Sequence, residues 1–172
     1  PRFPKPVYHR PFWHHQKDAV DEAEWRRLSG SDDNLAVLMS RAQDFVEERK
    51  YAKAAALYQL VLEKKPEHPV ALFEFGKNLT RIHQYEKAIE ILKKVSRYRP
   101  DSSELWAHLG LANQELGDLP EAARYYRKAL DINPDLGDVT MSYVHVLEPQ
   151  GRYREALKQL EHLASLYPAG QI

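Results

Sequence analysis

The sequence predicts an all-α protein, a solenoid of helix-turn-helix repeats preceded by an extended N-terminal arm. The prediction rests on a period of 34 residues, at which prolines, small residues and large apolar residues recur in register. Two columns of this alignment are Pro66, Pro100, Pro134 and Pro168, and Ala54, Ala88, Ala122 and Ala156. Two more are Tyr58, Leu92, Tyr126 and Leu160, and Ala42, Gly76, Gly110 and Val144. The four columns predict four repeats, at 35–68, 69–102, 103–136 and 137–170.

The third repeat shows the pattern most clearly. In each half of it, apolar residues recur three or four positions apart, as they do on one face of a helix. Gly117 and Asp118 separate the two halves as expected of a helix end and a turn, and Pro134 ends the second half. Gly110 and Ala122 are small residues at which the two backbones can approach closely. Each repeat is therefore a helical hairpin, and because it buries its apolar face only against its neighbours, the repeats form one solenoid.

These columns resemble the tetratricopeptide repeat, whose signature is a series of Trp, Leu-Gly, Tyr, Ala, Phe, Ala and Pro at this period. The resemblance covers 136 of the 172 residues. It implies a right-handed α-solenoid in which the first helix of each repeat lines a concave groove that binds a partner. Carried onto this chain, the family's groove positions are held by Met39, Gln43, Phe73, Lys77, Arg81, His108, Leu111, Met141 and His145. Their mixture of apolar and charged side chains suits a peptide or helix held mainly by side-chain burial.

One subclass of the family binds the C-terminal carboxylate of heat-shock chaperones through Lys, Asn and Arg side chains at fixed groove positions. Those positions hold Met39, Gln43, Glu74, Glu104 and His108 in repeats one to three, and Phe73, Lys77, His108, Asp138 and Ser142 when counted from repeat two. Neither set can clamp a terminal carboxylate, which the acidic members would repel. We therefore do not expect a chaperone tail as the partner.

Residues 1–17 differ from the rest of the chain. They contain four of the eleven prolines and four basic residues but no acidic one, and prolines favour an extended path. Phe3, Tyr8, Phe12 and Trp13 are costly to leave in water, so we expect an arm that lies on this solenoid or on a partner. A flexible tail is the alternative.

Residues 18–34 are expected to form a short capping helix and a linker. Trp25 and Leu28 would pack on the first repeat and cover the N-terminal end of the solenoid. The Ser-Asp-Asp segment at 31–33 can cap the first repeat helix, because these side chains accept hydrogen bonds from helix N–H groups.

The fourth repeat departs most from the pattern. Pro149 falls in the last turn of its first helix and should end that helix early, because proline has no backbone N–H. We expect no further helix to cover Leu157, Leu160 and Leu163. This C-terminal face is therefore a candidate interaction surface.

Composition and motifs give no sign of catalysis. The chain has 25 basic and 25 acidic residues, no cysteine, and no apolar run near the length of a membrane span. We find no phosphate-binding glycine loop, no paired metal-ligand spacing and no secretory signal pattern. His14 and His15 are adjacent and point opposite ways in an extended chain, which is poor geometry for a metal. We expect no enzyme activity, no metal and no cofactor, and the compartment stays open.

The sequence favours a non-catalytic scaffold, an adaptor or assembly subunit that holds other proteins of a larger complex. It would bind them through the groove, the arm and the C-terminal face. One alternative is a nucleic-acid contact through the basic, aromatic arm, although the chain lacks a basic stripe along the whole domain. A regulatory fragment of a larger enzyme is the other alternative.

Overall fold

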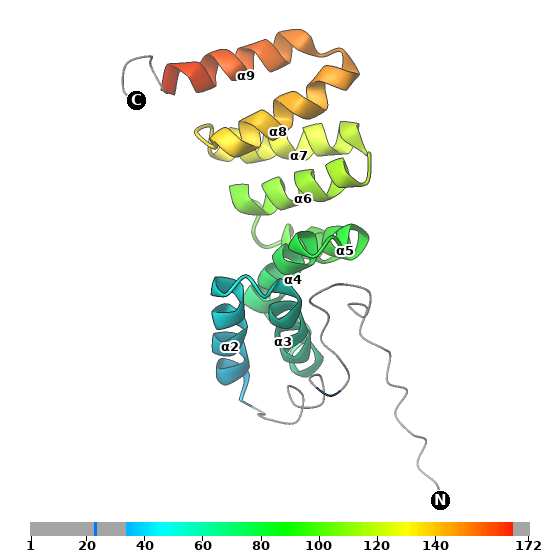
Figure 1. Cartoon of the computed structure of the whole chain (residues 1–172), viewed down its shortest axis with the longest axis vertical. Coiled ribbons are helices and arrows are strands. Elements are labelled where there is room, and N and C mark those ends of the chain that lie inside the picture. Colours follow the sequence, from blue (N-terminus) through cyan, green and yellow to red (C-terminus); the bar gives the residue numbers. More distant parts are fainter. Residues whose placement is uncertain (1–22, 24–33, 167–172) are drawn as a thin grey trace, which may run out of the picture.

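The computed structural model describes Ala23 and residues 34–166, and the following account is confined to them. The helices are α2 (Leu35–Glu47), α3 (Tyr51–Lys64), α4 (Pro69–Arg81), α5 (Tyr85–Val95), α6 (Ser103–Glu115), α7 (Leu119–Ile132), α8 (Gly137–Leu147) and α9 (Tyr153–Leu166), with a short 3-10 helix η2 (Glu148–Gln150) before α9. They stack in chain order into an elongated solenoid, with α2 and α9 at opposite ends (Figure 1). No strand occurs in this part of the chain, so the predicted all-α solenoid is confirmed.

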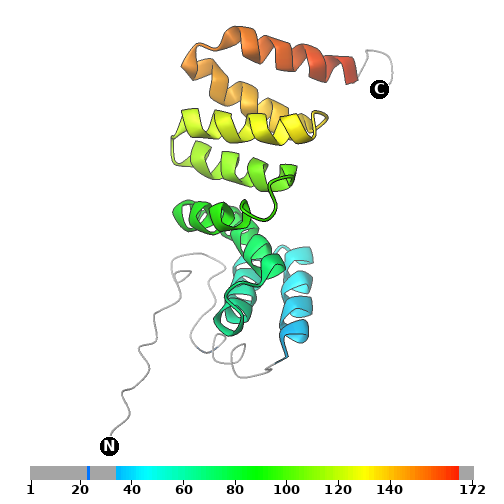
Figure 2. The same ribbon diagram turned by 180° about the vertical axis from the view of Figure 1, so that it is seen from behind.

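The helices pair as successive hairpins, and we call α2, α4, α6 and α8 the A helices and α3, α5, α7 and α9 the B helices. Each helix packs on the helices before and after it in the chain. Contacts beyond these neighbours link A helices of successive hairpins, α4 with α6 and α6 with α8. The view from behind shows the same stacking (Figure 2). Such a stack has no central core, and each hairpin depends on its neighbours for burial.

Glycines on the A helices make room for large side chains of the paired B helix. A Cβ added at Gly110 would lie 2.5 Å from Cδ1 of Tyr126, and one added at Gly76 would lie 2.6 Å from Cδ2 of Leu92. From the sequence we expected the backbones of the two helices of the third repeat to approach each other at Gly110 and Ala122. The structure instead uses the space at Gly110 for the Tyr126 ring, which is almost fully buried.

The turn inside each hairpin contains one residue in the left-handed region. Arg49, His83, Gly117 and Gly151 follow one another at intervals of 34 residues and have φ values of 59°, 61°, 80° and 69°. The helix end predicted at Gly117 is therefore present. The same backbone conformation recurs in the first two hairpins without glycine, where the side chain makes it less favourable.

Two helix ends test the sequence predictions directly. The Asn34 side chain accepts a hydrogen bond of 2.9 Å from the backbone N–H of Ala36, so Asn34 caps α2, while the segment 31–33 that was expected to cap it lies outside the described residues. The cap stands next to the first helical residue because its oxygen must reach the free N–H groups of the first turn. At the other end, α8 stops at Leu147 and the chain continues as η2 around Pro149, as predicted.

Candidate functional site: the A-helix surface and the C-terminal face

The residues predicted to line the groove lie on the A helices, and we call the surface they form the A-helix surface. They are Met39 and Gln43 on α2, Phe73, Lys77 and Arg81 on α4, His108 and Leu111 on α6, and Met141 and His145 on α8. Gln43, Met141 and His145 are exposed, and the others except Phe73 are half-buried. Met141, at 53% exposed, is the most accessible apolar side chain of the set.

Phe73 is 3% exposed and offers little surface to a partner. Two cations cover its ring, with Nζ of Lys77 at 5.0 Å and the Arg99 guanidinium carbon at 4.5 Å from the ring centroid. Two cationic side chains therefore lie over the ring where the sequence suggested an apolar anchor. Side-chain register alone does not reveal this, because Arg99 lies outside the A helices, after α5.

Lys77 joins α4 to α6 through two carboxylates. Its Nζ lies 3.1 Å from Oε1 of Glu74 and 2.7 Å from Oε1 of Glu104. The Lys77 side chain is 12% exposed, so these pairs are shielded from solvent more than ordinary surface pairs. The charge of Lys77 is thus matched within the protein.

Arg81 lies in the last turn of α4 and has no carboxylate partner in the part of the chain that the structure describes. Its guanidinium carbon lies 4.9 Å from the centroid of the Tyr51 ring, in a cation–π contact. Its Nη1 is buried and has no hydrogen-bond acceptor. The sequence did not indicate Tyr51, because the register assigned the partner surface to A helices and Tyr51 opens the B helix α3. An aromatic residue at the start of a B helix is the signal that was available.

His108 of α6 is half-buried, and its buried Nδ1 has no hydrogen-bond partner among the described residues. Burial, and next to it the charge of Arg81, lower the pKa of His108 to about 4. The imidazole is therefore neutral at pH 7 and carries one N–H donor and one acceptor. The structure brings Lys77, Arg81 and His108 together, whereas Met141 and His145 lie one hairpin further along.

Among the described residues, no element covers the C-terminal face. Leu157 is 57% exposed and Leu160 is 37% exposed, while Leu163 is half-buried. Their counterparts one repeat earlier, Ala123 and Tyr126, are 1% and 2% exposed, in the B helix α7 against which α8 packs. The face that α7 buries under the next A helix is thus open on α9.

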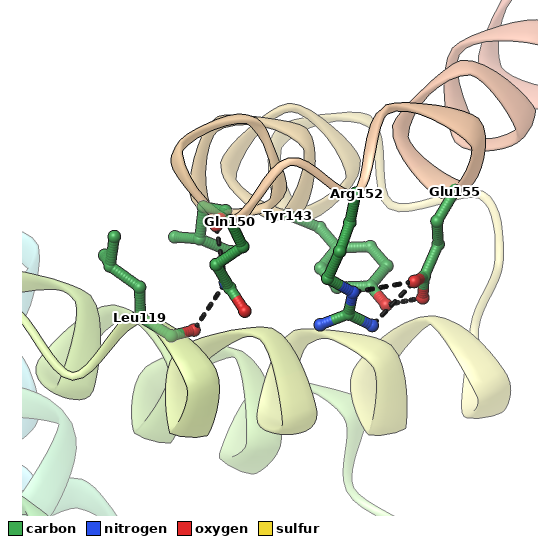
Figure 3. Close-up of polar contacts among 6 residues, drawn as sticks. Leu119, Tyr143, Gln150, Arg152 and Glu155 are labelled. Atoms are coloured by element: carbon green, nitrogen blue, oxygen red, sulfur yellow. Dashed lines mark hydrogen bonds and ion pairs between the residues drawn. The ribbon is translucent and has the colours of Figure 1, made fainter.

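A polar network fixes the turn that leads into α9 (Figure 3). Glu155 accepts hydrogen bonds of 3.0 Å and 2.6 Å from Nε and Nη2 of Arg152, and another from the hydroxyl of Tyr143. Gln150 donates to the carbonyl oxygens of Leu119 at 3.1 Å and Val146 at 2.6 Å. Neither set of contacts was foreseen, because the repeat columns carry no information on turn side chains.

Desolvation alone would raise the pKa of Glu155, but the hydrogen bonds from Tyr143 and Arg152 outweigh it and lower this pKa. Burial and the contact with Glu155 raise the pKa of Tyr143. The carboxylate is therefore ionised and the phenol neutral at pH 7, the pair of states that suits the hydrogen bond between them.

A surface cavity of about 340 Å³ lies on another side of the solenoid. Its lining includes Gln59, Leu62, Phe75, Lys87 and Ile91, from α3, α4 and α5. None of the predicted groove residues takes part in it. Its lining mixes apolar side chains with charged ones such as Glu63 and Lys94, and no sequence motif indicated it.

The remaining predicted residues lie outside the described part of the chain. These are Phe3, Tyr8, Phe12 and Trp13 of the arm, His14 and His15, and Trp25 and Leu28 of the expected capping helix. Among the described residues, no group of three or more His, Cys, Asp or Glu side chains is placed to hold a metal ion. The helices described here are also too short or too polar to cross a membrane.

Two family models, both described as tetratricopeptide repeat, match residues 45–111 and 103–136. Together these matches span more than half of the chain. The chain belongs to the tetratricopeptide-repeat family. Repeats of this family mediate protein–protein interactions and the assembly of complexes, and the resemblance seen in the sequence is confirmed.

Relatives in several organisms share the repeat region. An N-terminal acetyltransferase A complex subunit-like protein of Schizosaccharomyces pombe is 27% identical over 139 residues, 81% of this chain and 20% of its own length. A TPR repeat-containing protein of Methanocaldococcus jannaschii is 27% identical over 164 residues, covering 86% and 28% of the two chains. Human tetratricopeptide repeat protein 33 is 26% identical over 161 residues, covering 85% and 61%. The chain thus spans between a fifth and three fifths of these relatives.

Solved structures of MamA share the fold. MamA from Desulfovibrio magneticus RS-1 superposes with a TM-score of 0.76 at 21% identity, covering 87% of this chain and 84% of that one. The structure of MamA AMB-1 gives a TM-score of 0.71 at 22% identity, with the same coverage of 87% and 84%. At this identity the likeness concerns the fold alone, a solenoid of tetratricopeptide repeats.

Proposed function

We propose that this protein is a non-catalytic scaffold, an adaptor or assembly subunit that holds other proteins within a larger complex. The observation that supports it most is the open face of α9, where Leu157 is 57% exposed although the counterpart residue of α7 is 1% exposed. A repeat face of this kind is ordinarily covered by another helix. A contiguous apolar face left in water is typical of an interaction surface.

The A-helix surface would be the second contact. It joins exposed Met141 and His145 on α8 to the charged cluster of α4 and α6. The arm, with Phe12 and Trp13, would be the third, since aromatic anchors often dominate interface energies. The family supports a role in binding proteins, and a relative named as a subunit-like protein of an acetyltransferase complex agrees with a place in an assembly.

The test is capture of partners from the source cells by the full chain, compared across matched variants. Leu157→Asp places a charge on the open face, and we expect it to reduce capture of a stoichiometric partner at least about tenfold. Lys158→Gln, on the neighbouring exposed position, changes the net charge by the same amount and should capture normally. A chain that begins at residue 18 tests the arm separately.

Equal melting temperatures of the variants would show that the loss concerns binding and not folding. Equal capture by Leu157→Asp, Lys158→Gln and the unchanged chain would remove the α9 face from the proposal. If the shortened chain also captured the same proteins, the A-helix surface would be the remaining contact.

A further inference from the structure

Arg81 is a cation without a counter-charge on the A-helix surface. The carboxylates of Glu74 on α4 and Glu104 on α6 both contact Lys77. Among the described residues, the Arg81 side chain makes no ion pair or hydrogen bond, and its cation–π contact is with the ring of Tyr51, at 4.9 Å. A half-buried charge without a partner is unfavourable, so its retention calls for an explanation.

The guanidinium presents one free edge. Nη1 is buried and has no acceptor among the described residues. Nε and Nη2 have no acceptor among these residues either, but they are not buried, so both nitrogens retain exposed surface. Nε and Nη2 lie on the same edge of the planar group, the edge that can pair with both oxygens of a carboxylate. The Tyr51 ring holds the group by its face and leaves this edge open.

His108 lies on the next A helix, α6. Lys77 of α4 pairs with Glu104 of α6 at 2.7 Å, and Arg81 and His108 each stand four residues further along the same two helices. Nδ1 of His108 is buried, whereas Nε2 has no partner among the described residues and retains exposed surface. A neutral imidazole can donate one hydrogen bond to the same ligand oxygen that Arg81 binds. Two helices thus contribute one unpaired donor group each to a single place.

We propose that Arg81 and His108 form a carboxylate-binding subsite, and that it takes an aspartate or glutamate side chain of the bound partner. The proposal rests on the proposed function, because it names the chemistry of the partner at the A-helix surface. A single carboxylate suits the place better than phosphate or nucleic acid, because a polyanion would also meet Glu74 and Glu104. A clamp for a terminal carboxylate would need basic or amide side chains at the positions of these two glutamates. An Asp or Glu side chain within the partner therefore fits better than the partner's C-terminal carboxylate.

Peptide selection with the full chain tests the subsite. One random library displays peptides whose C-termini are fused to a carrier, and a second displays peptides with free C-termini. We expect the first library to yield peptides with Asp or Glu at one fixed position. Arg81→Gln should lose this preference, and Arg81→Glu should select Lys or Arg there. Arg154→Gln, an exposed arginine on α9, is the matched control and should select as the unchanged chain does.

Affinities of one selected peptide and of its Asp→Asn or Glu→Gln counterpart complete a double-mutant cycle. We expect the peptide change to weaken binding about tenfold or more in the unchanged chain and hardly at all in Arg81→Gln. The His108 ring resonances should shift when the acidic peptide binds. Far-UV spectra and melting curves verify that Arg81→Gln is folded.

The results of the peptide selection distinguish the carboxylate subsite from the broader proposal that the protein is a scaffold. Selected peptides without an acidic preference would overturn the subsite and leave binding at the A-helix surface intact. A preference found only at free C-termini would overturn the assignment to a side chain. If neither library yielded a peptide, the A-helix surface and its subsite would both be rejected, while the α9 face would still be judged by Leu157→Asp.

Discussion

At the scale of single residues, the space above Gly110 belongs to the Tyr126 ring. Gly110→Ala would place a Cβ 2.5 Å from Cδ1 of that ring. We expect it to destabilise the protein by ~1–3 kcal/mol, because a buried ring or the helix backbone must move. Thermal or urea unfolding measures this. Gly137→Ala is the control, since its Cβ would lie an ordinary 3.5 Å from Leu163, and it should be neutral or slightly stabilising.

In the turns of the first two hairpins, a substitution by glycine should stabilise the protein. Arg49 has a φ of 59°, a conformation that glycine adopts without strain. We expect Arg49→Gly to stabilise the protein by up to ~1 kcal/mol, less the added freedom of glycine in the unfolded chain. Gly117→Ala at the matching turn should destabilise by a similar amount. Equal melting temperatures for all three proteins would contradict this account of the turns.

His108 should make stability depend on pH. Its folded-state pKa of about 4 lies below its unfolded value near 6.5, so the unfolded chain binds more protons between these values. Stability is therefore complete above about pH 6.5 and falls as the pH drops toward 4, by on the order of 1–3 kcal/mol. His108→Gln removes this contribution. Urea unfolding at several pH values should show a flatter acid limb for the variant, and parallel curves would contradict the prediction.

At the scale of elements, α9 depends on its polar contacts with α8. Glu155→Gln replaces the carboxylate that accepts from both Tyr143 and Arg152. Because the Arg152 and Glu155 side chains are about a third exposed, we expect a modest loss of ~1 kcal/mol. Amide exchange in α9 should quicken while exchange in α4 and α6 stays unchanged. Glu161→Gln, an exposed change on the same helix, is the control.

The same contacts give α9 a pH dependence of its own. The lowered pKa of Glu155 means that its contribution is present above the unfolded value near 4.3 and is lost as the pH falls through the folded value. Exchange in α9 should therefore respond to acid, and Glu155→Gln should remove that response.

At the scale of the whole molecule, the sequence predicted the solenoid well because the same pattern of small and large residues recurs in each repeat and predicts the same helix packing each time. The helix end at Gly117 and the early end of α8 at Pro149 followed from backbone chemistry that is local to those residues. Contacts between different elements did not follow. The stacking of Arg81 on Tyr51 and the covering of Phe73 by Arg99 depend on where side chains from neighbouring helices meet. The repeat register predicts which helix face a residue lies on, but it does not predict which side chain of a neighbouring helix the residue contacts.

The order of contacts along the stack also sets how the molecule responds to force. Helices contact their neighbours in sequence, so a pull on the two ends passes through the hairpins in series, and each junction bears the full load. The junction with little burial should part first, and we expect that to be the one under α9, in which Ala156 is the buried residue. Extension would then proceed in steps, each releasing one repeat with a contour length of ~110–120 Å. A partner bound across two hairpins would hold their junction together, so the first unfolding step would require a higher force.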